Sequence, residues 1–230
     1  MLDELRNQVC QANHDLVRHG LVTLTWGNVS GIDRSRGLVA IKPSGVPYED
    51  LESEHIVIVD LNGEVAEGQM KPSSDTATHL RLYTAFASIG GITHTHSRFA
   101  TMFAQARHSI PCLGTTHADH FNGPIPVTRP LTDEEVRADY EGHTGDVIVE
   151  AFEQLDPVAT PAVLVAGHGP FTWGVDSLAS VENAVALEAV VEMALGTRQI
   201  DRDAMELEDY VREQHYYRKH GAGATYGQSK

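Results

Sequence analysis

The feature that most constrains the fold of this chain is a double glycine followed by a short β-prone run with two histidines, residues 90–97 (GGITHTHS). In an extended strand, side chains two residues apart point to the same face. His94 and His96 can therefore close on one ion without a bend in the backbone, and neutral imidazole is a favoured ligand of zinc and neighbouring transition metals. Because the chain contains 13 histidines, such a pair could also arise by chance, so a metal site needs further ligands.

Two more residues are candidate ligands. His168 directly follows the apolar run 162–166, which is typical of a buried strand that ends in a turn. Ligands of open α/β sheets commonly lie at the carboxyl ends of strands, so this position favours a metal site over a chance pair. Asp75, in the segment KPSSD at 71–75, is a fourth candidate, although the first turn of a helix also favours an acid there.

Length and composition bound the class of protein. A chain of 230 residues with 41% hydrophobic content can bury one substantial core, and the absence of a composition shift or linker predicts a single domain over residues 1–230. The net charge of -15 argues against a nucleic-acid partner and against an anionic membrane surface.

The two cysteines and the amino terminus bear on the compartment. Cys10 and Cys112 lie far apart without CxxC spacing, so the sequence predicts neither a disulfide framework nor a thiolate metal site. The acidic, amphipathic start at residues 1–5 is unlike a secretory signal, and no apolar run approaches the roughly 20 residues that span a bilayer. We expect a soluble, cytoplasmic protein.

Three loops have a composition suited to phosphate, namely residues 27–28, 42–45 and 71–74. Serine hydroxyls, glycine amides and helix amino termini bind phosphate oxygens, and a lysine adds a point charge. Each loop alone is weak evidence, because Lys-Pro-Ser turns are common at protein surfaces. In a strongly acidic chain, however, a phosphorylated substrate needs such local compensation, and together with a metal the loops predict a phosphorylated small molecule as ligand.

The hydrophobic periodicity predicts a mixture of helices and strands. Residues 2–16 have the spacing of an amphipathic helix, residues 22–25 are β-prone, and 132–135 form a capping box. Asn62 and Gly63 between two β-prone runs predict a hairpin. Taken alone, these patterns favour an α/β fold with a parallel sheet.

The motifs together identify a family. They are TWGN at 25–28, KPSG at 42–45, KPSSD at 71–75, HTHS at 94–97, GTTHAD at 114–119, HGPF at 168–171, RKHG at 218–221 and YGQ at 226–228. In this order they closely resemble the L-ribulose-5-phosphate 4-epimerases of the class II aldolase and adducin-head family. The resemblance spans residues 1–228.

The resemblance implies a three-layer α/β/α domain, class II aldolase-like, with a central, largely antiparallel sheet. It also implies a homotetramer with fourfold symmetry and active sites at the subunit interfaces. The glycine-rich tail, residues 221–230, would then cover a neighbouring subunit's site.

The same resemblance implies the roles of individual residues. Zinc would be the metal, although manganese or cobalt suits the same donors, and its ligands would be Asp75, His94, His96 and His168. The residues that contact the substrate would be Gly27, Asn28, Lys42, Ser44, Gly45, Ser73 and Ser74. Asp119 and Tyr226 would be the acid and base pair, with Tyr226 reaching in from a neighbouring subunit.

The implied reaction is inversion of C4 of a ketopentose phosphate, interconverting L-ribulose 5-phosphate and D-xylulose 5-phosphate by cleavage and re-formation of the C3–C4 bond. Relatives with this reaction act in arabinose, ascorbate or gulonate breakdown. Lys42 would contribute charge and not form a Schiff base. Two positions depart from the relatives, Ala166 in place of a histidine and His120 in place of a tyrosine, and His120 could alter how Asp119 titrates.

Two alternatives remain at this point. A class II aldolase of the L-fuculose-1-phosphate type shares the fold and metal but releases both fragments, and in that branch a glutamate follows the paired serines where this chain has Asp75. A non-enzymatic adducin-head-like assembly module keeps the fold without the metal. The joint presence of three histidines, Asp119 and Tyr226 argues against the module.

Overall fold

The computed structural model describes residues 2–220 and 224–225. The helices are α1 (Leu2–Arg18), α2 (Thr76–Ala85), α3 (Arg98–Ala106), α4 (Thr115–Ala118), α5 (Asp133–Ala151), α6 (Ser177–Ile200) and α7 (Asp209–His220), with 3-10 turns at Tyr48–Asp50 and Ser53–His55. The strands are β1 (Asn28–Asp33), β2 (Leu38–Ile41), β3 (Val57–Asp60), β4 (Val65–Glu67), β5 (Gly91–His94), β6 (Ala162–Leu164) and β7 (Pro170–Gly174).

The strands of the described residues form one 7-stranded sheet in the order β4-β3-β2-β1-β5-β7-β6. Every pair of neighbouring strands is antiparallel. The antiparallel sheet implied by the resemblance is confirmed, and the parallel sheet favoured by the patterns alone is wrong. The reason is that both faces of this sheet are covered, so strands such as β2 (LVAI) and β3 (VIVD) are almost continuously apolar, a pattern that parallel sheets usually show.

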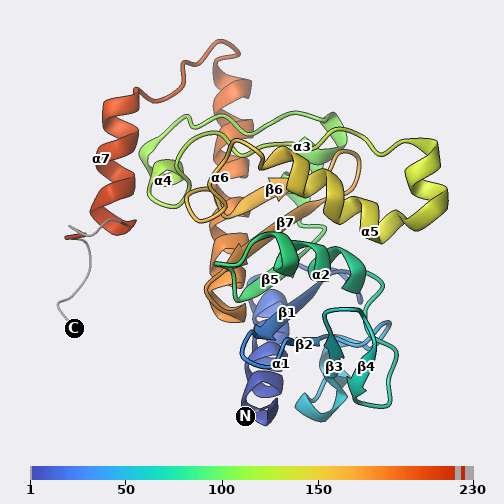
Figure 1. The fold of residues 1–230 in the computed structure, drawn as a ribbon. Coiled ribbons are helices and arrows are strands. Elements are labelled where there is room, and N and C mark those ends of the chain that lie inside the picture. The colour runs from blue at the N-terminus through green and yellow to red at the C-terminus, as the bar shows by residue number, and fades with distance from the viewer. Residues whose placement is uncertain (1, 221–223, 226–230) are drawn as a thin grey trace.

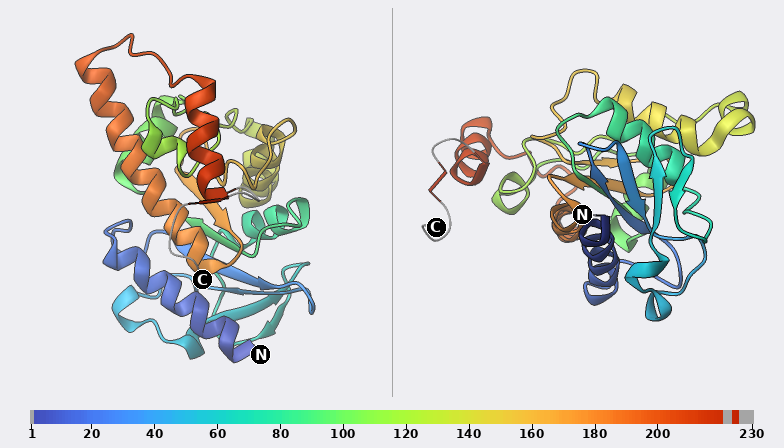
Figure 2. Two further views of the ribbon diagram at one scale, coloured as in Figure 1. Left: turned by 90° about the vertical axis from the view of Figure 1, so that its left-hand side faces the viewer. Right: turned by 60° about the horizontal axis from the view of Figure 1, so that its bottom comes forward.

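Helices cover the sheet on both faces, which gives the expected three-layer α/β/α architecture (Figures 1 and 2). On one face, α2 and α5 pack with β2, β3, β5 and β7 around Tyr83, Ile92 and Trp173. On the other face, Val9 and Leu16 of α1 and neighbouring residues of α6 pack against the sheet. Helix α3 and the second half of α6 enclose a further apolar cluster with β6.

Alternation along β5 decides which layer each of its side chains meets. Ile92 belongs to the cluster formed by α2 and α5. Thr93 points to the opposite face, where its Oγ1 lies 2.7 Å from Ser180 Oγ of α6. His94, two residues after Ile92, therefore lies on the α2 and α5 side of the sheet.

A row of glycines crosses the middle of the sheet and explains the double glycine of the sequence. Gly31 pairs with Gly91, and Gly91 pairs with Gly174, so three neighbouring strands each place a glycine at the same level. A Cβ at Gly91 would collide with the backbone at Asp176 and Ser177, where α6 begins. A Cβ at Gly174 would lie 2.7 Å from Ala179 Cβ. The missing side chains therefore allow the start of α6 to lie directly on the sheet.

One expected strand is absent. Residues 22–25 form a turn, in which Trp26 N donates a hydrogen bond to Thr23 O over 3.1 Å. Leu24 has a left-handed backbone with φ of 55°, and no regular strand tolerates such a residue. The β-prone composition of this segment is overridden because the chain must reverse between α1 and β1.

Within the described residues, no helix combines the length and apolar character needed to cross a membrane.

We expect Gly91→Ala to lower the free energy of unfolding by about 1–3 kcal/mol, because the new methyl group meets backbone that cannot move without displacing α6. Urea denaturation at constant m-value measures this change. Gly196→Ala is the matched control, since Gly196 lies inside α6 with nothing within 4 Å of its Cβ position. That variant should be neutral or gain up to about 1 kcal/mol. Equal stabilities of the two variants would contradict the close approach.

Candidate functional site

Three imidazoles that are distant in the sequence meet at one end of the sheet. His94 ends β5, His96 follows two residues later, and His168 lies in the turn between β6 and β7. One potential ligand atom from each ring lies within 4.8 Å of the other two. The Nε2 atoms of His94 and His96 are 3.1 Å apart. The structure thus brings together the three histidines that the sequence singled out.

The orientation of His94 is fixed by its surroundings. Its Nδ1 lies 2.9 Å from Pro170 O, and since a carbonyl only accepts, Nδ1 carries the proton and donates. The ring also stacks on Phe171 with centroids 4.1 Å apart. The lone pair is therefore on Nε2, which faces the cluster. A backbone carbonyl that holds the outer nitrogen in this way is typical of metal-binding histidines.

The cluster is electrically suited to a cation. Burial lowers the pKa of His168 to about 3, and the neighbouring His94 and His96 act in the same direction. Burial and His94 also lower the pKa of His96. Both imidazoles are therefore neutral at pH 7, with lone pairs free for a ligand bond. These two neutral imidazoles, together with His94, whose Nε2 lies 3.1 Å from that of His96, fit a divalent transition-metal ion.

Two glycines let other loops approach this cluster. A Cβ at Gly169 would lie 2.7 Å from Thr95 O and 3.3 Å from the His96 ring. A Cβ at Gly27 would lie 2.7 Å from His94 O, and Gly27 has a positive φ of 82°. Both positions require glycine, so the loops before β1 and β7 can close around the two histidines of the β5 end.

A carboxylate from α6 holds the segment after His96. Glu188 accepts hydrogen bonds from Phe99 N at 2.8 Å and Ala100 N at 3.0 Å, the free amides of the first turn of α3. The N-cap residue Ser97 makes no side-chain cap of its own. Glu188 supplies that cap from a distant helix, which fixes where α3 begins relative to His96.

Asp75 lies beside the cluster at the N-cap position of α2, one residue before the helix. Its Oδ2 accepts a hydrogen bond from Asn28 Nδ2 over 2.6 Å, and the same amide donates to Ser73 Oγ over 3.1 Å. Burial by itself would raise the pKa of Asp75, but the neighbouring His94 and His79 and the Asn28 amide lower it further than burial raises it. Asp75 is thus an ionised carboxylate at the site, outside the group of three mutually close imidazoles.

The two Lys-Pro-Ser loops pair with each other. Ser44 N donates to Lys71 O over 2.9 Å, and Ser73 N donates to Lys42 O over 3.0 Å. These two backbone amides are therefore occupied by the pairing. The pairing also explains why two separate sequence motifs with the same composition form one wall of the same cavity.

Lys42 is a buried cation at this wall, only 2% exposed. Its Nζ donates to Val46 O over 2.8 Å and lies 4.8 Å from the centroid of the Tyr48 ring. Burial lowers the pKa of Lys42 to about 8. In the unfolded chain the Lys42 amine keeps its proton to a higher pH. Burial of the charged amine therefore lowers the free energy of unfolding at neutral pH, and this cost decreases as pH rises above about 8.

One cavity of about 400 Å³ joins these features. It is lined by every predicted ligand or substrate-binding residue, namely Gly27, Asn28, Lys42, Ser44, Gly45, Ser73, Ser74, Asp75, His94, His96 and His168. The cavity is also lined by Thr25, Trp26 and Pro43, which belong to the sequence motifs but were given no role, and by Tyr140 and Glu141, which no motif contains. Trp26 is adjacent to a predicted glycine, and this adjacency was a usable signal. Tyr140 and Glu141 lie within α5, where no feature of the sequence marks them.

Asp119 does not line this cavity. It follows α4, and its carboxylate accepts hydrogen bonds from Arg218 at 2.8–3.1 Å and from His215 Nδ1 at 3.1 Å, both in α7. Burial would raise its pKa, but these hydrogen bonds and the charge of Lys219 lower it overall. His120, the neighbouring departure, has a pKa lowered by burial and by Lys219. The other predicted acid–base residue, Tyr226, lies outside the described residues.

The fold and the site together define a class of three-layer α/β/α proteins with a histidine cluster at the end of a central antiparallel strand. The chain belongs to the family described as Class II Aldolase and Adducin N-terminal domain, whose match covers residues 7–195.

Individual relatives agree with this assignment. The chain is 53% identical over 227 residues to the L-ribulose-5-phosphate 4-epimerases UlaF of Salmonella paratyphi A and Salmonella typhi, a match that covers 99% of this chain and 100% of theirs. Among solved structures, an L-fuculose 1-phosphate aldolase superimposes with a TM-score of 0.79 at 25% identity, over 92% of this chain and 94% of that one.

We expect Asp119→Asn to release α7 at neutral pH, because it removes the negative charge that Arg218 and His215 share. The pKa of Asp119 is lowered in the folded chain, so its contribution is present at pH 7 and is lost as pH falls below about 4, the ordinary carboxyl value. Amide-exchange protection factors of residues 209–220 measure this effect. The control is Asp133→Asn, whose 80% exposed carboxylate pairs within α5. Unchanged protection in Asp119→Asn would contradict the role of the carboxylate.

Proposed function

We propose that this protein is a metal-dependent L-ribulose-5-phosphate 4-epimerase that interconverts L-ribulose 5-phosphate and D-xylulose 5-phosphate. The observation that carries the proposal is that the phosphate-type loops and the three imidazoles line one cavity. The full-length 53% identity to proteins named as this epimerase supports the same substrate. A cavity lined both by candidate metal ligands and by loops of phosphate-binding composition suits a sugar phosphate.

The proposed metal is zinc, held by His94, His96 and His168 with Asp75 as an additional ligand. Imidazole nitrogens favour zinc, and manganese or cobalt could replace it in this donor set. When bound, the ion supplies Lewis-acid stabilisation of the negative charge that develops on the substrate oxygens at C2 and C3. The neutral state of His168 and the fixed tautomer of His94 support this assignment.

The residues of the chain hold the other end of the substrate. Asn28, Ser44, Gly45, Ser73 and Ser74 are proposed to bind the phosphate, with Gly27 shaping the wall beside them. The buried Lys42 contributes positive charge near this group and forms no Schiff base. While the phosphate stays bound, the fragment that carries C4 rotates in place, so that it presents its opposite face.

The reaction that fits this site breaks the C3–C4 bond, because the C4 proton is not adjacent to the C2 carbonyl and is barely acidic. A base removes the proton of the C4 hydroxyl, C4 becomes an aldehyde, and the C3–C4 electron pair moves toward C3 and C2. After rotation the bond re-forms at the other face, and an acid returns a proton to the C4 oxygen. Asp119 and Tyr226 are proposed for these opposed roles.

A neighbouring subunit is proposed to supply Tyr226 of the acid–base pair. Asp119 does not line the cavity of its own protomer, and α7, whose Arg218 binds the Asp119 carboxylate, ends at His220, shortly before Tyr226 in the sequence. A homotetramer with active sites at its interfaces would bring this region to another protomer's metal cluster. Residues 1–230 are proposed to form one catalytic domain, with the tail 221–230 as a cover for the neighbouring subunit's site.

The compartment we propose is the cytoplasm, where sugar phosphates are metabolised. The pathway we propose is carbohydrate breakdown, such as that of arabinose.

A class II aldolase is the second candidate, favoured by the structural match to an L-fuculose 1-phosphate aldolase. It differs in releasing the two fragments instead of rejoining them. Asp75 in place of the longer glutamate of that branch favours the epimerase.

The decisive test is to incubate the protein with L-ribulose 5-phosphate as purified, after chelation, and after zinc is restored. We expect D-xylulose 5-phosphate to form without accumulation of glycolaldehyde phosphate, to disappear on chelation and to return with zinc, because the metal stabilises the charge that bond cleavage creates. Quantitative product analysis measures all three arms. Release of both fragments would instead place the protein among the aldolases, and absence of turnover with any divalent metal would favour an assembly module.

We further expect KM for the sugar phosphate to rise as pH increases above about 8, where Lys42 loses its proton. Lys42→Met should raise KM at pH 7 by roughly ten- to a hundredfold, the effect of losing one charge-assisted hydrogen bond. Steady-state kinetics between pH 6.5 and 9.5 measure both effects. Lys71→Met is the control, because Lys71 is exposed and does not line the cavity. A KM that stays constant through this range would contradict the proposed role.

A further inference from the structure

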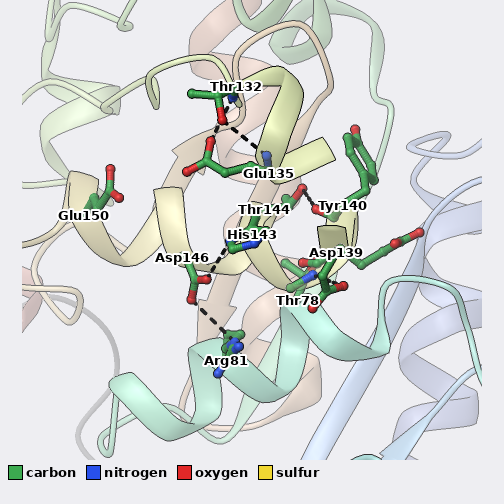
Figure 3. A network of polar contacts seen from close by, with 12 residues as sticks. Thr78, Arg81, Thr132, Glu135, Asp139, Tyr140, His143, Thr144, Asp146 and Glu150 are labelled. Carbon is green, nitrogen blue, oxygen red and sulfur yellow. Dashed lines mark hydrogen bonds and ion pairs between the residues drawn. The ribbon is translucent and has the colours of Figure 1, made fainter. Parts of the chain in front are cut away.

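Helix α5 is interrupted at Asp139, close to the candidate site. Asp139 has φ of -162° and ψ of 86°, an extended conformation inside the span Asp133–Ala151. The segment before it has its own capping box at Thr132 and Glu135. Figure 3 shows that the two segments differ in direction and that Tyr140 stands at their junction. The break therefore starts a second helical segment at this residue.

Asp139 caps this second segment. Its Oδ1 accepts a hydrogen bond from Gly142 N over 3.1 Å, which satisfies one of the free amides of the new first turn. A Cβ at position 142 would collide with the same carboxylate, so a side chain there would displace the cap. Tyr140 and Glu141 consequently occupy the first turn, and both line the cavity.

The second segment is also tied to α2. Thr78 Oγ1 of α2 donates to Glu141 O over 2.6 Å, and Thr144 Oγ1 donates to Tyr140 O over 2.8 Å. One turn further on, Arg81 Nε lies 3.4 Å from Asp146 Oδ1 (Figure 3). The backbone of Tyr140 is thus fixed relative to the helix that follows Asp75.

The side chain of Tyr140 reaches the third histidine of the cluster. Its hydroxyl lies 3.4 Å from His168 Nδ1, and the two ring centroids are 6.1 Å apart. His94 has a backbone carbonyl as partner for its outer nitrogen, whereas the phenol is the partner that the structure gives to His168 Nδ1. A phenol oxygen can accept from that nitrogen and leave the lone pair on Nε2.

We propose that Tyr140 is a positioning residue that holds His168 for metal binding, and that the break of α5 at Asp139 serves to place it there. This inference rests on the metal site of the proposed function. This role gives a reason for the break of α5 at Asp139, which neither the core packing nor the substrate loops explain. The partner of a ligand's outer nitrogen typically changes metal affinity by about 10- to 100-fold.

The test compares zinc and cobalt binding of apo wild type with Tyr140→Phe, Asp139→Ala and Asp139→Asn. Chelator competition gives the affinity, and the visible spectrum of the cobalt form reports ligand geometry. Tyr140→Phe should weaken binding about tenfold, the low end of the range because the contact is long, and should alter the spectrum. Asp139→Ala should do the same, whereas Asp139→Asn should bind like wild type, because asparagine caps equally well.

Tyr210→Phe is the control, since Tyr210 is 73% exposed on α7. An affinity and spectrum of Tyr140→Phe equal to those of Tyr210→Phe would overturn the inference, even if Asp139→Ala fails to fold. If Asp139→Asn loses as much affinity as Asp139→Ala, the capping explanation is overturned. If the wild type itself binds neither zinc nor cobalt, the proposed metal-dependent function is wrong, and the role of Tyr140 is wrong with it. If the wild type binds metal and Tyr140→Phe behaves like Tyr210→Phe, only the role of Tyr140 is wrong.

Discussion

The contact on which the rest of the structure depends is the approach of α6 to the glycine row of the sheet. Gly91 lies at the centre of that row, between Gly31 and Gly174 on the neighbouring strands. The start of α6 can press on the sheet there because no side chain intervenes. This contact fixes β5 between its two neighbours, and β5 ends at His94. Further along, Glu188 of the same helix caps α3 immediately after His96. One helix therefore sets the position of both histidines.

The site itself carries polar groups that a core made only for stability would not contain. The Nε2 of the fully buried His79 and the Oδ1 of Asn28 have no partner among the described residues. Lys42 is buried with only loop carbonyls and an aromatic ring around it. Each such group costs stability in the absence of a ligand. Of these groups, Asn28 and Lys42 line the cavity, where a bound ligand would complete their interactions, whereas His79 does not line it.

The two helices on the other side of the sheet have a complementary task. Helix α2 begins beside Asp75, and α5 is broken at Asp139 where it crosses α2. The hydrogen bond from Thr78 of α2 to Glu141 of α5 holds the neighbouring Tyr140 at the cavity, which His94, His96 and His168 also line. Both helical layers thus act on the site. Helix α6 sets the position of β5 and α3, whereas α2 and α5 hold residues that line the cavity. Neither layer alone would hold three imidazoles at a common point.

The sequence by itself determined the chemistry of the site. The spacing of His94 and His96, the position of His168 after an apolar run, and the repeated Lys-Pro-Ser loops named many of the residues that line the cavity, because these signals are local and depend on period and turn composition. Only the tertiary structure decided the rest. The antiparallel order, the place of Asp119 under α7 and the contact of Tyr140 with His168 arise between segments far apart in the chain. Such contacts leave no periodic trace, since burial on both faces makes parallel and antiparallel strands look alike, and no residue pattern marks the break of α5 at Asp139.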